Sequence, residues 1–243
     1  MDSSMEYLTN LEGTQVTFDA FAEPPFNFPA QKWIILEKLG EESNRLTKED
    51  IAAELGPSDT AGKFLCRPAS EEDDSRRAFL RIYQQVPTAG TEAKKAAIRA
   101  SQAVDTPPDH SELIAFRTFT KLDCDVVPRL LGYQQRQQDD YEGVPGGYIT
   151  YILWEKFAGE SLNLTEFWGF PFADRQAIRD KFRQVYTHIC GFKRASPFDE
   201  PQQWGDINYF QYGLIQPSDS QFDWEGTPPR TADWIEDVNG WTW

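Results

Sequence analysis

The order of hydrophobic patterns along the chain constrains its fold more than any single motif does. Residues 62–67 and 77–83 have strand composition and are joined by an acidic turn, which predicts a β-hairpin. Residues 111–122 repeat apolar side chains at the spacing of one helix face, and two further strand patterns follow them. The longest pattern, residues 174–190, is that of an amphipathic helix closed by a glycine. Strands followed by a long helix predict an α+β protein.

The rest of the chain gives shorter patterns. Residues 47–55 begin with Thr47 as an N-cap and Asp50 three residues later, which predicts a helix. Residues 91–103 are rich in Ala and Lys and also favour a helix. Residues 1–30 scatter Phe among Pro, a pattern typical of an extended arm without regular elements. The strand patterns lie at 126–133 and 148–154, and residues 33–36 suit a short strand or a helix.

The charge balance excludes some partners. The chain has 243 residues with 24 Lys and Arg against 39 Asp and Glu, a net charge of −15. Such a surface disfavours broad contact with phosphate groups, so we expect no DNA and no membrane as partner. The N-terminus has neither a basic start nor an apolar segment, and no run reaches membrane-spanning length, so we expect the protein in the cytoplasm.

Cysteine and histidine are too few and too dispersed for a metal site or a disulfide framework. Cys66, Cys124 and Cys190 lack CxxC spacing and are expected to be reduced thiols. The only histidines are His110 and His188, so we expect no metal-binding residues of this kind.

One loop carries a chemical pattern. In the stretch from Gly205 to Gln211, Asp206 stands five residues before an amide side chain. In phosphoryl transfer, an aspartate at this spacing orients and deprotonates the acceptor hydroxyl, and the amide oxygen binds a magnesium ion. Here the amide belongs to Gln211, one methylene longer than the usual asparagine.

Three further segments carry a resemblance to a known family. They are Leu80-Arg81-Ile82-Tyr83-Gln84-Gln85-Val86-Pro87, Pro128-Arg129-Leu130-Leu131-Gly132-Tyr133 and Val144-Pro145-Gly146-Gly147-Tyr148-Ile149-Thr150-Tyr151. From about residue 62 onward the chain resembles small fungal kinase-like proteins, mostly of unassigned activity and distantly similar to aminoglycoside phosphotransferases. The resemblance implies a protein-kinase-like two-lobed fold, with an antiparallel-sheet N-lobe and a truncated helical C-lobe. The expected parts are an arm (1–30), an N-lobe (31–157) and a short C-lobe (158–243) with a long helix (174–190) and a catalytic-type loop (204–211).

The resemblance also assigns roles to single positions. Arg81 takes the place of the phosphate-binding lysine, with Glu112 as its partner, and this pair is either part of a ligand site or purely structural. Asp206 takes the place of the catalytic base. The second metal-binding aspartate is either Asp223 or Asp237.

The ATP site implied by this resemblance is degenerate. No G-x-G-x-x-G motif lies between residues 39 and 63, where the phosphate-covering loop would be expected. ATP with magnesium therefore stays open as a cofactor but is disfavoured, and no cofactor is assigned with certainty.

These departures favour an enzyme that uses the scaffold for other chemistry in fungal secondary metabolism. Its carboxylates would bind a cationic or amino-acid-derived substrate or exchange protons with it. Candidate catalytic residues are Glu112, Asp206, Asp223 and Asp237, and candidate substrate-binding residues are Arg81, Glu155, Gln211 and Glu225.

One concrete form of this hypothesis is a tRNA-dependent synthase of arginine-containing cyclic dipeptides, acting on an aminoacyl substrate. Candidate tRNA contacts are Lys94, Lys95, Arg99, Arg129 and Arg136, which equally suit a solvated face. The alternatives are a pseudokinase-type binding or scaffold module and, less favoured, an active small-molecule phosphotransferase. The oligomeric state is left open.

Overall fold

The computed structural model describes residues 5–70, 76–104, 106–157, 162–189, 205, 207–217 and 241–242. The chain divides into two compact units, Met1–Phe157 and Ala158–Trp243, and each is described by itself. The division lies where the sequence patterns change from strands to helices. None of the described helices is both long and apolar enough to cross a membrane.

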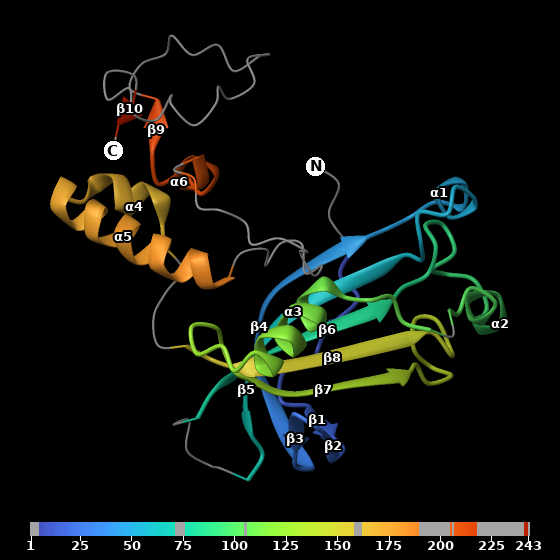
Figure 1. Ribbon diagram of the computed structural model, residues 1–243. Coiled ribbons are helices and arrows are strands. Elements are labelled where there is room, and N and C mark those ends of the chain that lie inside the picture. The colour runs from blue at the N-terminus through green and yellow to red at the C-terminus, as the bar shows by residue number, and fades with distance from the viewer. Residues whose placement is uncertain are drawn as a thin grey trace. The chain divides into compact units, whose positions relative to one another are not determined.

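A six-stranded antiparallel sheet forms most of the first unit (Figure 1). Every neighbouring pair in it is antiparallel, and a separate two-stranded hairpin packs near its edge. In spatial order the strands of the sheet are β1 (Gln15–Phe18), β4 (Gln31–Asn44), β5 (Asp59–Pro68), β6 (Ala78–Gln85), β8 (Tyr148–Glu155) and β7 (Leu130–Gln137). The hairpin consists of β2 (Phe21–Glu23) and β3 (Phe26–Phe28).

The two edges of the sheet approach each other, so that it is nearly a closed barrel. The side-chain amide of Gln31, at the start of β4, donates to the carbonyl oxygen of Leu131 in β7 at 2.8 Å. The backbone N–H of Asp19, just after β1, donates to the side-chain oxygen of Gln134 at 3.1 Å. Closure of this kind protects the exposed hydrogen-bonding groups of edge strands.

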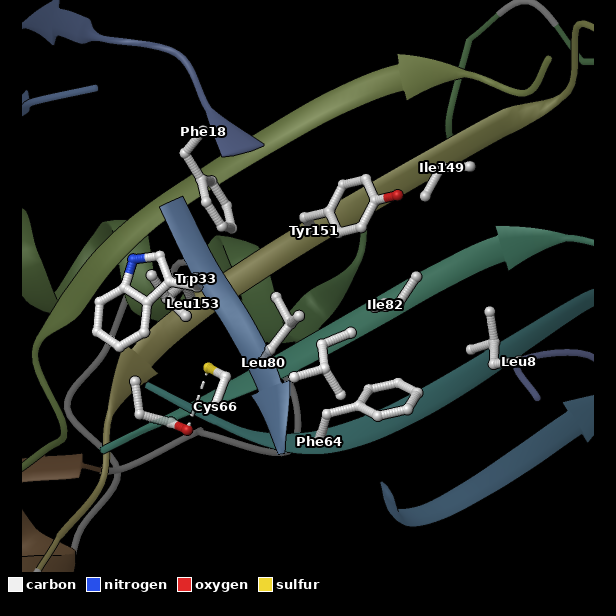
Figure 2. Packing of buried hydrophobic residues seen from close by; sticks show 12 residues of the cluster. Leu8, Phe18, Trp33, Phe64, Cys66, Leu80, Ile82, Ile149, Tyr151 and Leu153 are labelled. Carbon is white, nitrogen blue, oxygen red and sulfur yellow. Dashed lines mark hydrogen bonds between the residues drawn. The ribbon is translucent and has the colours of Figure 1, made fainter. Parts of the chain in front are cut away.

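Apolar side chains cover both faces of the sheet. On one face, Figure 2 shows aromatic and aliphatic side chains such as Phe18, Trp33, Phe64 and Leu80 packed together, with the thiol of Cys66 in contact with the Ala78 carbonyl oxygen at 3.3 Å. On the other face lies α3 (Ser111–Lys121), visible in green in Figure 1. Its Leu113 and Phe116 pack on Ile152 and Trp154 of β8, and the strand is therefore buried along nearly its whole length.

Two short helices lie at one end of this sheet. They are α1 (Lys48–Ala52) and α2 (Ala96–Ala100). The expected capping box starts α1: the Thr47 hydroxyl accepts from the Asp50 N–H at 3.2 Å, and the Asp50 carboxylate accepts from the Thr47 N–H at 2.8 Å. These two bonds satisfy amide groups that have no partner inside the helix.

The second unit contains a small core of its own. Its described elements are α4 (Leu164–Gly169), α5 (Phe172–Ile189), α6 (Ile207–Gln211), β9 (Gln216–Pro217) and β10 (Trp241–Thr242). Phe167, Tyr209 and Leu214 are buried together in it. The guanidinium of Arg179 lies in the same core and donates to the Leu214 carbonyl oxygen at 2.8 Å.

The predicted two-lobed protein-kinase-like fold with a truncated helical C-lobe is wrong. The described structure is instead dominated by strands in a nearly closed antiparallel sheet, with few helices. The described residues 5–30 contain three strands where we expected an arm, and β1 carries the sheet towards closure with β7. The order of a hairpin, a helix and two strands is compatible with several sheet topologies. It does not show that β1 and β4 extend the sheet on its other side.

Single elements agree better with the sequence. The hairpin of β5 and β6, the helix α3, the strand β8 and the long helix α5 lie close to their predicted positions. The pattern at 91–103 gives only α2, and the strand predicted at 126–133 begins later, after Pro128. The described part of the predicted catalytic-type loop, Ile207–Gln211, is a short helix.

Candidate functional site

Two of the predicted site residues meet between β6 and α3. The guanidinium Nε of Arg81 donates to Oε2 of Glu112 at 3.2 Å, as expected for this pair. The same carboxylate oxygen accepts from the hydroxyl of Tyr83 at 2.9 Å. Arg81 and Tyr83 reach it together because alternate residues of a strand point to one face, and α3 covers that face.

The surroundings of this pair are poorly solvated. Burial raises the pKa of Tyr83, and the charge of Glu112 raises it further. Burial also lowers the pKa of Lys63, which lies opposite Arg81 in the sheet, and the positive charge of Arg81 adds to this effect. Glu112 already accepts hydrogen bonds from two side chains of β6, Arg81 and Tyr83. The geometry therefore favours a structural role for the Arg81–Glu112 pair, which fixes α3 to the sheet.

The remaining predicted residues do not join this group within the described structure. Glu155 is exposed at the end of β8, and Gln211 is exposed at the end of α6 in the other unit. Asp206, Asp223, Glu225 and Asp237 lie outside the described residues. The catalytic hypotheses that depend on them therefore stay predictions.

The predicted tRNA-contacting side chains include two that are engaged within the unit. Arg99 donates to the backbone carbonyl oxygens of Glu142 and Gly143, and Arg136 donates to the hydroxyl of Tyr151 at 2.6 Å. These contacts hold loops and strands together. A tRNA partner stays a prediction.

A cleft that the sequence did not reveal opens at the end of the sheet beside α1 and α2. It has a volume of about 830 Å³. Its lining includes Lys48 and Ile51 of α1, Ile98 of α2, and Lys94, which lies just before α2. Both isoleucines are exposed, at 39% and 47% of their surface.

The floor of the cleft is a network of hydrogen bonds. Gln85, the last residue of β6, donates to the Gln102 carbonyl oxygen at 2.7 Å. The Gln102 side chain in turn accepts from the Thr88 N–H at 2.9 Å and donates to the Thr91 hydroxyl at 3.0 Å. On the other side the Ser58 hydroxyl accepts from the Leu46 N–H at 2.9 Å. These bonds fix the floor before any ligand enters.

A pattern in the sequence marks this cleft in retrospect. Lys48 and Ile51 are three residues apart within α1 and so lie on one side of it, whereas Lys94 lies just before α2 and Ile98 lies within it. An isoleucine near a lysine at two places in the chain is a weak signal, because it does not show that the two places face each other across a space.

The described residues contain no group of three or more His, Cys, Asp or Glu side chains that could hold a metal ion. Cys66 and Cys124 are free thiols. Comparison with family models, curated proteins and solved structures finds no match for this chain, and the resemblance to fungal kinase-like proteins stays a prediction.

Proposed function

We propose that the first unit is a binding module for a small molecule with an apolar body and an anionic group, and that the ligand binds in the cleft beside α1 and α2. The observation that carries this proposal is the lining of the cleft, where two lysines stand beside two exposed isoleucines. It develops the hypothesis of a binding module and does not depend on a kinase-like fold.

The size and the shape of the cleft suit a small molecule. Ligand sites typically have volumes of about 300–1,000 Å³ and combine apolar walls with a few placed polar groups. The cleft has a volume of about 830 Å³, apolar walls from Ile51 and Ile98, and a polar floor that starts at Gln85. A floor held by its own hydrogen bonds reduces the entropy lost when a ligand binds.

The charge of the cleft supports an anion. The chain as a whole has a net charge of −15, but the charged side chains that line the cleft are Lys48, Lys94 and one glutamate, Glu54. Neither lysine forms an ion pair with any residue in the described part of the chain. Local positive charge within an acidic protein attracts anions to this place. For the cationic substrate expected from the sequence, this lining offers a single carboxylate, that of Glu54.

The cytoplasm remains the proposed location. It is supported by the free thiols of Cys66 and Cys124, which suit a reducing compartment.

Two fluorescent probes of similar shape test the proposal. Anilinonaphthalene sulfonate is an amphipathic anion, and N-phenylnaphthylamine is its neutral counterpart. We expect the double variant Lys48→Gln/Lys94→Gln to bind the anionic probe about fivefold more weakly than the wild type, since exposed ion pairs contribute roughly 0.5 kcal/mol each. The affinity for the neutral probe should stay the same.

A matched control removes the same charge elsewhere. The variant Lys121→Gln/Lys156→Gln changes two lysines that do not line the cleft. The proposal fails if the wild type binds neither probe, or if both double variants weaken the anionic probe equally.

A further inference from the structure

A row of polar side chains runs across the sheet beneath the start of α3. Tyr83 of β6 lies directly opposite Thr150 of β8. Tyr148 stands two residues before Thr150 and so points to the same face, the one on which Ile152 packs against α3. The ring of His110, the residue before α3, stacks on Tyr83 with centroids 3.9 Å apart and lies 6.0 Å from the ring of Tyr148.

Three polar atoms in this row lack a partner. The Nε2 atom of His110, the hydroxyl of Tyr148 and the hydroxyl of Thr150 are buried and form no hydrogen bond with the described residues. The three residues are 9%, 1% and 0% exposed, respectively. Buried polar side chains nearly always have a hydrogen-bond partner, because they lose their contacts with water on folding. Three such side chains along one row need a hydrogen-bond partner, either water or a group of a bound ligand.

These side chains are uncharged near neutral pH. Burial lowers the pKa of His110 to about 4, although the charge of Asp109 opposes the change. Burial raises the pKa of Tyr148, and the nearby charge of Asp59 adds to this effect. Charged groups on this face include the ion pair Arg81–Glu112, Lys63, Asp59 and Arg117, whose guanidinium lies over the rings of Phe26 and Tyr133. Neutral groups that both donate and accept hydrogen bonds suit a neutral polar partner.

The row begins where the cleft ends. Gln85 follows Tyr83 by two residues and points to the same face, and it also lines the cleft. Its side chain donates to the Gln102 carbonyl oxygen at 2.7 Å and accepts from the Val104 N–H at 3.0 Å, and both of these residues line the cleft as well.

We infer that Tyr148, Thr150 and His110 form a polar end of the ligand site, which receives a neutral hydroxyl or amide group of the molecule bound in the cleft. This inference rests on the proposed function. The ligand is then an amphipathic anion with a second, neutral polar group remote from its charge.

Fatty acids and their ω-hydroxy derivatives are the probes for this inference. Titration calorimetry would compare octanoate, decanoate and dodecanoate with the corresponding ω-hydroxy acids, so that several distances between the two groups are covered. We expect at least one hydroxy acid to bind the wild type about three- to tenfold more tightly than its parent acid, the effect of one or two neutral hydrogen bonds.

Conservative variants locate the effect. The preference should disappear in Thr150→Val, which keeps the shape of the side chain, and in Tyr148→Phe. It should persist in Tyr141→Phe, a control at an exposed loop position. Thermal unfolding without ligand verifies that each variant is folded.

Failure of this inference and failure of the proposed function give different results. If the wild type binds neither kind of acid, the proposed function is wrong, and this inference is overturned with it. If both kinds bind equally and the two row variants change nothing, the cleft binds its ligand without the row. Ordered water then satisfies these three groups, and this inference alone is overturned.

Discussion

Removal of the Glu112 carboxylate is expected to weaken the attachment of α3 to the sheet. Glu112 accepts from Tyr83 at 2.9 Å and from Arg81 at 3.2 Å, and its side chain is only 19% exposed. Hydrogen bonds to a charged group contribute about 1.5–3 kcal/mol each, and partial exposure of the pair to solvent reduces this value. We therefore expect Glu112→Ala to lower the free energy of unfolding by about 2–3 kcal/mol and Glu112→Gln, which keeps an acceptor, by about 1 kcal/mol.

Urea denaturation followed by tryptophan fluorescence measures this change. With a slope of about 2 kcal/mol per M, the midpoint for Glu112→Ala should fall by about 1–1.5 M. The control is Glu155→Ala, since Glu155 is exposed at the end of β8 and its loss should cost less than about 0.5 kcal/mol. A double-mutant cycle with Tyr83→Phe should give a coupling of about 1 kcal/mol. Equal midpoints for Glu112→Ala and Glu155→Ala would refute the structural role.

Three further predictions concern local packing and protonation. Gly147→Ala should lower the free energy of unfolding by about 1–3 kcal/mol, because a Cβ there would lie 2.7 Å from a glutamine oxygen and 2.9 Å from a carbonyl oxygen. Gly169→Ala should leave the stability unchanged, since a Cβ at this position meets no atom within 4 Å. Similar urea midpoints for the two variants would contradict this prediction. Burial raises the pKa of the Cys66 thiol to about 12, so at pH 8 Cys66 should resist iodoacetamide while the half-buried Cys124 reacts. Peptide mass spectrometry measures the labelling of each cysteine, and equal labelling of the two would contradict this prediction. His110 has a folded pKa of about 4, below the unfolded value of 6.5, so its contribution to stability is present above pH 6.5 and is lost as the pH falls towards 4. Urea titrations at several pH values should show this slope in the wild type and a smaller one in His110→Phe, whereas identical slopes would rule it out.

Local signals predicted several elements correctly. The capping box of Thr47 and Asp50 begins α1, and β5 pairs antiparallel with β6 as the predicted hairpin requires, because both signals depend on residues close together in the sequence. The strand β4 was recognised only in part, since its register shifts after Ile35 and after Lys38 and the alternation of apolar residues is lost there. The hairpin of β2 and β3 has strands of three residues around two prolines, too short for a periodic pattern.

The candidate site was harder to predict than the elements. The ion pair Arg81–Glu112 was expected, but the hydrogen bond from Tyr83 to the same carboxylate was not, because it depends on where α3 lies across the sheet. The cleft brings together residues from 48 to 104 that have no common spacing, and its existence depends on the packing of two helices of five residues each. Sequence periodicity describes one element at a time, so it cannot show a space between elements.

Methyl NMR of isoleucine-labelled protein tests the central claim most directly, namely that the cleft beside α1 and α2 binds an amphipathic anion. During titration with decanoate, the methyl signals of Ile51 and Ile98 should shift together and give one dissociation constant. The signals of Ile35 and Ile215, which are buried and line neither the cleft nor the polar row, should move much less. If Ile51 and Ile98 do not respond, or if they respond no more than the buried isoleucines, the cleft is not the ligand site.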